Sequence, residues 1–260
     1  MPGISEAIKI AVTSGKGGVG KTIVTINLAM FYARQNKKVL ILDGDLGLSN
    51  IDVAFGLAPK FNLKHVITGK KSLQDIIVTG PLGIMVIPAG SGVKELTNLT
   101  TPQQLNLLAD FQSLNQQVDV LLIDTGAGIS NNVFYLCNMA NDVVIVVTPE
   151  PTSIADAYVM LKVLTRDFRR TNLKMVVNNA RSQKEAQDTV KKLYLVADRF
   201  LNISFDYPGY LPYEQKITES VNAQRAFIDM YPNSSFSKKL ADIGKALMEN
   251  PTPLGAGLAL

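Results

Sequence analysis

The sequence predicts an α/β protein with a doubly wound, mostly parallel sheet flanked by helices, and three observations carry this prediction. Short runs rich in Val and Ile alternate along the chain with longer segments of helical spacing. These runs are apolar without interruption, as is typical of strands buried on both faces. A glycine-rich loop stands between the first run and the first helical segment. In such a sheet the loops that follow the parallel strands gather at one edge, where ligands bind.

The alternation sets the order of the elements. The expected strands cover residues 8–12, 39–42, 84–87, 120–123, 143–147 and 173–177. The expected helices cover residues 21–34, 102–116, 153–168, 185–200 and 236–250. The last helix has an apolar face of Phe236, Leu240, Ile243 and Leu247, which predicts packing on the sheet. No Pro/Gly/Ser-rich linker divides the chain, so we expect one domain over residues 1–250 and a flexible tail over residues 251–260.

The composition excludes several classes of protein. The chain of 260 residues is 47% hydrophobic, which excludes general disorder. The chain has one cysteine, Cys137, which excludes an intramolecular disulfide and a Cys-rich metal site within one chain. It also has one histidine, His65. We find no secretory signal and no apolar run long enough to span a bilayer, so we expect a cytoplasmic protein. The formal charge of +4 does not by itself call for a nucleic-acid partner.

One motif carries specific chemistry. Residues 15–22 follow the first expected strand, open the first expected helix and fit the P-loop pattern G-x-x-x-x-G-K-[ST]. Backbone N–H groups of such a loop cradle phosphate oxygens, and the helix N-terminus adds its positive dipole. Lys21 is expected at the β- and γ-phosphates and Thr22 on Mg²⁺. The predicted nucleotide-binding residues here are Gly15, Lys16, Gly17, Gly18, Val19, Gly20, Lys21, Thr22 and Ile23.

Acidic residues end two other expected strands. Residues 120–123 are apolar and lead into Asp124, a Walker-B-type pattern, so we expect Asp124 to hold Mg²⁺. The second strand ends in Asp43-Gly44-Asp45, whose two carboxylates point the same way on an extended chain. Beside a Mg²⁺–nucleotide, Asp43 would lie near the metal and Asp45 would align the attacking water.

The additional lysine of the P-loop, Lys16, identifies a family. The loop resembles the deviant Walker A motif of the MinD/ParA ATPases, the SIMIBI class of P-loop NTPases. The resemblance implies a slow, Mg²⁺-dependent ATPase that forms a homodimer in the ATP state, with Lys16 of one subunit reaching the phosphates of the other. Residues 43–48 are similar to the switch I of the family. Residues 124–128 are similar to its switch II, although Gly126 stands where the family usually has Pro or Ala.

Within this family the chain looks most like the FlhG group of flagellar-number regulators, also called FleN or YlxH. Residues 47–52, 148–158, 178–181 and 223–227 carry that likeness. It implies ATP-dependent regulation of flagellar number or placement, with partners such as an FlhF-like GTPase or proteins of the flagellar switch complex. The same likeness implies that Asn178 contacts the edge of the nucleobase and that Pro212, Tyr213 and Glu214 lie around the base. It also implies that Glu150 approaches the nucleotide of the partner subunit.

Two features depart from that group. Only seven residues precede the first expected strand, where FlhG proteins often carry a Gln-rich motif that activates FlhF, so we do not expect that activation here. FlhG and MinD also use a C-terminal amphipathic helix on membranes, which the tail of this chain matches poorly. Binding to the inner face of the cell membrane therefore stays open.

Other functions remain as alternatives. A ParA-like partition ATPase would bind non-specific DNA through a basic surface, for which Arg166, Arg169, Arg170 and Lys174 are the candidates. The mild net charge favours a solvated helix end for these residues. A carrier of metal clusters is disfavoured by the single cysteine, and a bacterial tyrosine kinase by the absence of a Tyr-rich tail.

Overall fold

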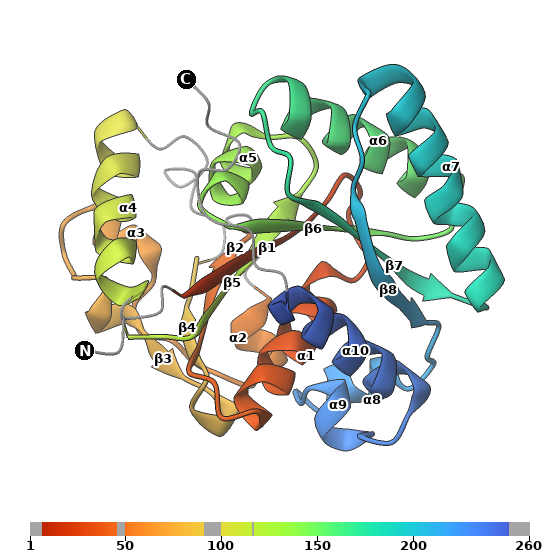
Figure 1. Cartoon of the computed structure of the whole chain (residues 1–260). Coiled ribbons are helices and arrows are strands. Elements are labelled where there is room, and N and C mark those ends of the chain that lie inside the picture. Colours follow the sequence, from red (N-terminus) through yellow and green to blue (C-terminus); the bar gives the residue numbers. More distant parts are fainter. Residues whose placement is uncertain (1–6, 46–49, 91–99, 116, 250–260) are drawn as a thin grey trace, which may run out of the picture.

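The computed structural model describes residues 7–45, 50–90, 100–115 and 117–249 and contains a sheet in the order β3-β4-β2-β5-β1-β6-β7-β8 (Figure 1). All pairs are parallel except the short β3 with β4. The strands are β1 (Ile8–Ser14), β2 (Val39–Gly44), β3 (Val78–Thr79), β4 (Met85–Ile87), β5 (Val120–Ala127), β6 (Asp142–Val147), β7 (Leu173–Ala180) and β8 (Asp206–Pro212).

The first strand lies at the centre of this sheet. Ile10 of β1 pairs with Leu122 of β5 on one side and with Asp142 of β6 on the other. Asp43 of β2 is in register with Asp124 of β5, the strand between β2 and β1. The loops after β1, β2, β5 and β6 therefore meet at the same edge of the sheet.

Helices cover both faces of the sheet, with two short 3₁₀ turns between α3 and β4. Their bounds are α1 (Lys21–Arg34), α2 (Ile51–Ala54), α3 (Leu63–Ile67), α4 (Thr101–Asn115), α5 (Asn131–Asn138), α6 (Pro151–Arg166), α7 (Gln183–Leu201), α8 (Ile217–Asn222), α9 (Phe227–Met230) and α10 (Ser235–Glu249).

Two apolar cores, one on each side of the sheet, hold the layers together. The core under α4–α7 includes Phe111, Phe134 and Leu161, while the core under α1, α9 and α10 includes Tyr32 and Phe236. The predicted doubly wound fold is thus confirmed.

The structure differs from the expected elements mainly by additions. Every expected strand and helix is present, and their ends move by a few residues. The additional strand β8 contains Pro208 and Gly209, residues that weaken a strand and are tolerated at a sheet edge. The apolar face of α10 is buried, as predicted, because all four of its residues are at most 1% exposed. The predicted tail, residues 251–260, lies outside the described residues.

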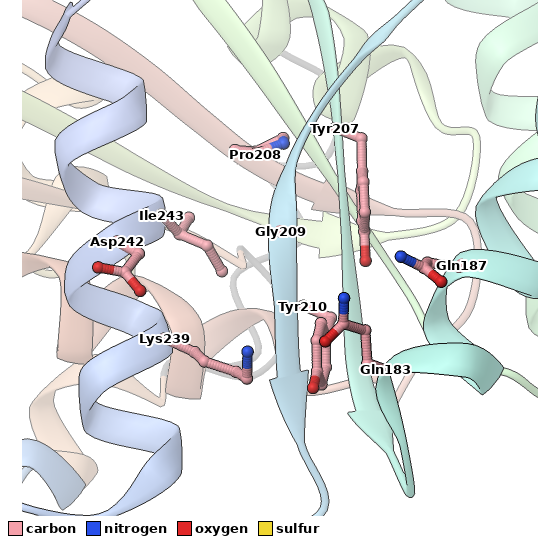
Figure 2. A pocket seen from close by; sticks show the side chains of 9 residues that line it. All are labelled: Gln183, Gln187, Tyr207, Pro208, Gly209, Tyr210, Lys239, Asp242 and Ile243. Carbon is pink, nitrogen blue, oxygen red and sulfur yellow. The ribbon is translucent and has the colours of Figure 1, made fainter.

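A cavity of about 280 Å³ lies beside β8, between α7 and α10 (Figure 2). Gln183 and Gln187 line it from α7, and Lys239 and Asp242 from α10. Two of the residues that line the cavity contact each other: the ammonium of Lys239 lies 4.2 Å from the centre of the Tyr210 ring, a cation–π contact. No helix in the described part of the chain is long and apolar enough to cross a membrane.

Candidate nucleotide-binding site

The P-loop joins β1 to α1 in a conformation that glycine makes possible. Gly18 and Gly20 have φ values of 76° and 95°, in the left-handed region that disfavours other side chains. A Cβ at Gly15 would lie 2.2 Å from the carbonyl oxygen of Asp156, so this position has no room for a side chain. Gly20 is the N-cap of α1 and supplies no capping side chain. The N–H groups of the first turn are therefore available to an anion.

The side chains below the loop form a buried polar cluster. Thr22 Oγ1 donates to Asp124 Oδ2 at 2.7 Å, and Thr25 Oγ1 donates to the other carboxylate oxygen at 3.1 Å. Lys21 is 7% exposed, and burial lowers the pKa of its ammonium, opposed by Asp124 and then Asp45. Burial, and after it the Asp43 carboxylate, raise the pKa of Asp124 to about 7. The cluster thus contains closely spaced charges that a cation can compensate.

Asp43 binds backbone on both sides of residues 46–49. Its Oδ1 accepts the N–H of Asp45 at 3.2 Å, and its Oδ2 accepts those of Asn50 and Ile51 at 3.2 and 3.3 Å. Asp45 also lies near the expected switch II, since a Cβ at Gly126 would be 3.7 Å from Asp45 Oδ1. Of the expected switch I, Leu46, Gly47 and Leu48 lie outside the described residues.

The residues fit a nucleotide with Mg²⁺. Thr22, Asp43 and Asp124 offer hard oxygen ligands, and Mg²⁺ prefers one or two carboxylates together with phosphate and water oxygens. Within the described residues no cluster of three or more His, Cys, Asp or Glu could hold a metal by itself.

Lys16 contacts residues of its own chain in this structure. Its Nζ lies 2.5 Å from Glu150 Oε2 and 3.0 Å from Thr152 Oγ1. Both partners belong to the start of α6, which the P-loop also approaches through Gly15. The sequence alone does not predict this pairing, because no local spacing connects residues so far apart in the chain.

Glu150, the partner of Lys16, also lines a cavity of about 440 Å³. Three parts of the chain line this cavity. They are the segment after β6 (Thr148, Pro149 and Glu150), the region of β7 and α7 (Asn179, Arg181 and Glu185), and the segment after β8 (Tyr213). Tyr213 is 63% exposed. Pro212 ends β8, and the Glu214 carboxylate accepts the N–H of Lys216 at 3.2 Å. Asn178 does not line this cavity: it is 4% exposed and donates to the Val19 carbonyl of the P-loop at 2.8 Å.

The basic residues considered for DNA binding are largely engaged within the fold. Lys174 is 5% exposed, and its Nζ lies 3.0 Å from Asp206 and 3.7 Å from Asp142. Arg170 donates to the carbonyls of Ala140 and Asn141, and Arg166 donates to that of Phe200. Lys174 and Arg170 are therefore paired within the fold, whereas Arg166 and Arg169 are exposed.

Comparisons with known proteins agree with this geometry. A ParA family model, described as "NUBPL iron-transfer P-loop NTPase", matches residues 6–248. The chain is 40% identical to the antiactivator FleN of Pseudomonas aeruginosa over 94% of this chain and 87% of that protein. It is 32% identical to the flagellum site-determining protein YlxH of Helicobacter pylori over 92% of this chain and 81% of that protein.

Solved structures give the same result. In the MinC:MinD cell division complex of Aquifex aeolicus, one chain is similar to this one with a TM-score of 0.78 and 26% identity. The match covers 95% of this chain and 98% of that chain.

Proposed function

Because the chain belongs to the ParA/MinD family of P-loop NTPases, we propose that it is a Mg²⁺-dependent switch ATPase that dimerises with ATP and regulates flagellar number or placement. The observation that carries the ATPase is the cluster of Lys21, Thr22 and Asp124 beneath the P-loop, in which Lys21 and Asp124 are buried. The flagellar role is supported by the likeness to FleN and YlxH.

The residues divide the work of phosphoryl transfer. The N–H groups of the P-loop and the Lys21 ammonium bind the phosphates and offset the charge that grows on them in the transition state. Mg²⁺, when bound by Thr22 with Asp43 and Asp124 nearby, supplies further neutralisation of this charge. Asp45 orients the attacking water, and its backbone N–H ties it to Asp43.

The same contacts make the site a switch. Asp43 holds the backbone of Asp45 on one side and of Ile51, the first residue of α2, on the other. A change in the ligands of this carboxylate therefore reaches α2 directly, and loss of the γ-phosphate releases the contacts that order the switch. In the dimer, Lys16 leaves Glu150 and Thr152 and reaches the partner's phosphates.

Sedimentation with Mg²⁺ and either ATP or ADP tests the proposal. The wild-type chain is expected to dimerise with ATP and stay monomeric with ADP. Lys16→Ala is expected to bind ATP yet remain monomeric, while Lys60→Ala, a change at an exposed lysine, should behave as the wild type. Asp45→Ala is expected to retain the ATP dimer because hydrolysis is lost. An ATP dimer of unchanged affinity in Lys16→Ala would contradict this mechanism.

The cellular role has its own test. Cells without this chain are expected to show an altered number or position of flagella, counted by electron microscopy. The wild-type gene should restore the pattern and the Lys16→Ala gene should not. Normal flagella in the deletion strain would exclude the flagellar role and leave the ATPase assignment intact.

A further inference from the structure

Strands β1 and β5 lose their regular register where they enter the nucleotide site. Val12 pairs with Asp124, whereas Ser14, two residues later, pairs with Ala127, three residues later. Strand β5 therefore has one residue more than β1 over this stretch, which makes it a β-bulge. Bulges are rare between parallel strands and frequent beside active sites, where they redirect the chain. This one falls within the expected switch II, residues 124–128.

Both ends of the bulged segment are attached to β1. The Thr125 hydroxyl is buried and lies 2.9 Å from the hydroxyl of Thr13. The N–H of Gly128 donates to the carbonyl oxygen of Ser14 at 2.9 Å. Switch II is therefore held at its two ends by the strand that leads into the P-loop.

Ser14 contacts both the P-loop and switch II, with different atoms. Its carbonyl oxygen accepts the N–H of Gly128, while its Oγ donates to the carbonyl oxygen of Lys16 at 2.7 Å. The residue is 0% exposed, so its hydroxyl cannot exchange this bond for one to water, and losing the bond is costly. Gly15 lies between the two bonded residues and is packed so closely against Asp156 that the loop has little room for another path.

The bond from Ser14 bears on the direction in which Lys16 points. The Lys16 ammonium contacts Glu150 and Thr152 in the free chain, and in the proposed ATP dimer it reaches the phosphates of the other subunit. The rotamers open to a side chain depend on the φ and ψ of its own residue. A hydrogen bond that fixes the backbone at Lys16 therefore limits where the ammonium can go.

We propose that Ser14 is a positioning residue, whose hydroxyl holds the backbone of Lys16 for its reach across the dimer and whose carbonyl connects that backbone with switch II. The inference rests on the proposed switch function and adds a residue to it. A shift of switch II on binding of the γ-phosphate would reach Lys16 through two hydrogen bonds in series. Phosphate binding by Lys21 does not use this connection.

Sedimentation with Mg²⁺ and ATP, together with calorimetric titration of ADP, tests this role. Ser14→Ala removes the hydroxyl and keeps the carbonyl that accepts the N–H of Gly128. Its ATP dimer is expected to have a dissociation constant about tenfold higher, as for the loss of one hydrogen bond. Its ADP affinity is expected to stay at the wild-type value, which a general loosening of the P-loop would not allow.

Ser220→Ala is the matched control. Ser220 is 2% exposed, and its hydroxyl donates to the carbonyl oxygen of Ile217 at 2.8 Å, within α8. This variant also loses a buried serine hydroxyl but should keep the wild-type dimer. Ser14→Cys, which fills a similar space with a weak donor, separates the hydrogen bond from packing and should weaken the dimer as Ser14→Ala does.

All variants are compared at equal folded fraction by circular dichroism. A dimer of wild-type affinity in Ser14→Ala or Ser14→Cys would overturn the proposal. Equal losses of ADP affinity and of dimer affinity would overturn it as well, because Ser14 would then support the phosphate loop in general. If the wild-type chain bound no nucleotide or formed no dimer with ATP, the proposed function itself would fail, which separates the two cases.

Discussion

The proposed nucleotide site has two ends that are built differently: the phosphate end beneath the P-loop, and the base end, where the family resemblance places the nucleobase. At the phosphate end, Asp43 and Asp124 are at most 1% exposed, and hydroxyls of α1 bond directly to Asp124. At the base end, Glu150 and Tyr213 are exposed and lie after different strands. A buried polar cluster must have its partners in place before ligand arrives, whereas exposed side chains can adjust to it. Affinity should therefore depend on the phosphate end and selectivity on the base end.

Lys21→Ala tests the phosphate end most severely. Loss of the buried ammonium removes a charge-assisted contact to the phosphates, so we expect ATP affinity to fall by about a hundredfold or more. Isothermal titration with Mg²⁺ and ATP measures it, with Lys37→Ala at an exposed position as the control. A loss of less than threefold would show that Lys21 does not hold phosphate.

The pKa of Asp124 predicts how the nucleotide-free chain responds to pH. Because the pKa is about 7 in the folded state and near 4 in an unfolded chain, the folded state retains a proton that the unfolded state has lost between these values. The free energy of unfolding should therefore fall by a few kcal/mol as pH rises from about 4 to about 7.

Urea unfolding at a series of pH values measures this fall. Asp124→Asn, which cannot ionise, should flatten the slope over that interval. An equally steep slope in this variant would assign the pH dependence to other groups.

Tyr213→Ala probes the base end. Its ring is exposed in the free chain and would be covered by a bound base, so its loss should weaken ADP by about fivefold, corresponding to roughly 1 kcal/mol. Tripolyphosphate binding, measured in parallel, should be unchanged. A matching loss for tripolyphosphate would mean that the two ends are not separable.

Glu150→Gln tests the boundary between the two ends and should have the smallest effect. The ion pair with Lys16 is exposed, and such pairs contribute about 0–1 kcal/mol, so the melting temperature should barely change. Since Lys16 is released, the ATP dimer should form at a two- to threefold lower ATP concentration by sedimentation. Loss of the dimer would instead indicate that Glu150 serves the partner's nucleotide.

The residues predicted for the phosphate end come from local signals in the sequence. The P-loop is one contiguous motif, and Asp43 and Asp124 each follow an apolar strand that periodicity identifies. No motif marks Thr25, although it lies one helical turn after Thr22 and so faces the same side.

The base end depends on contacts that no local pattern contains. Lys16 meets Glu150 and Thr152, and Asn178 meets Val19, only after β6 and β7 have taken their places beside β1. Strand β8 is not predicted from the sequence because Pro208 and Gly209 interrupt the apolar pattern that marks the other strands.

Cys137 gives the chain a practical advantage for following the dimer. It is fully buried, and burial raises the pKa of its thiol to about 12, so thiol-directed dyes should leave it unmodified in the folded protein. Because it is the one cysteine in the sequence, a cysteine placed at an exposed position such as Lys60 would be the one reactive thiol. Spin labels or fluorophores could then report the distance between subunits as ATP is added, with the native cysteine left in place.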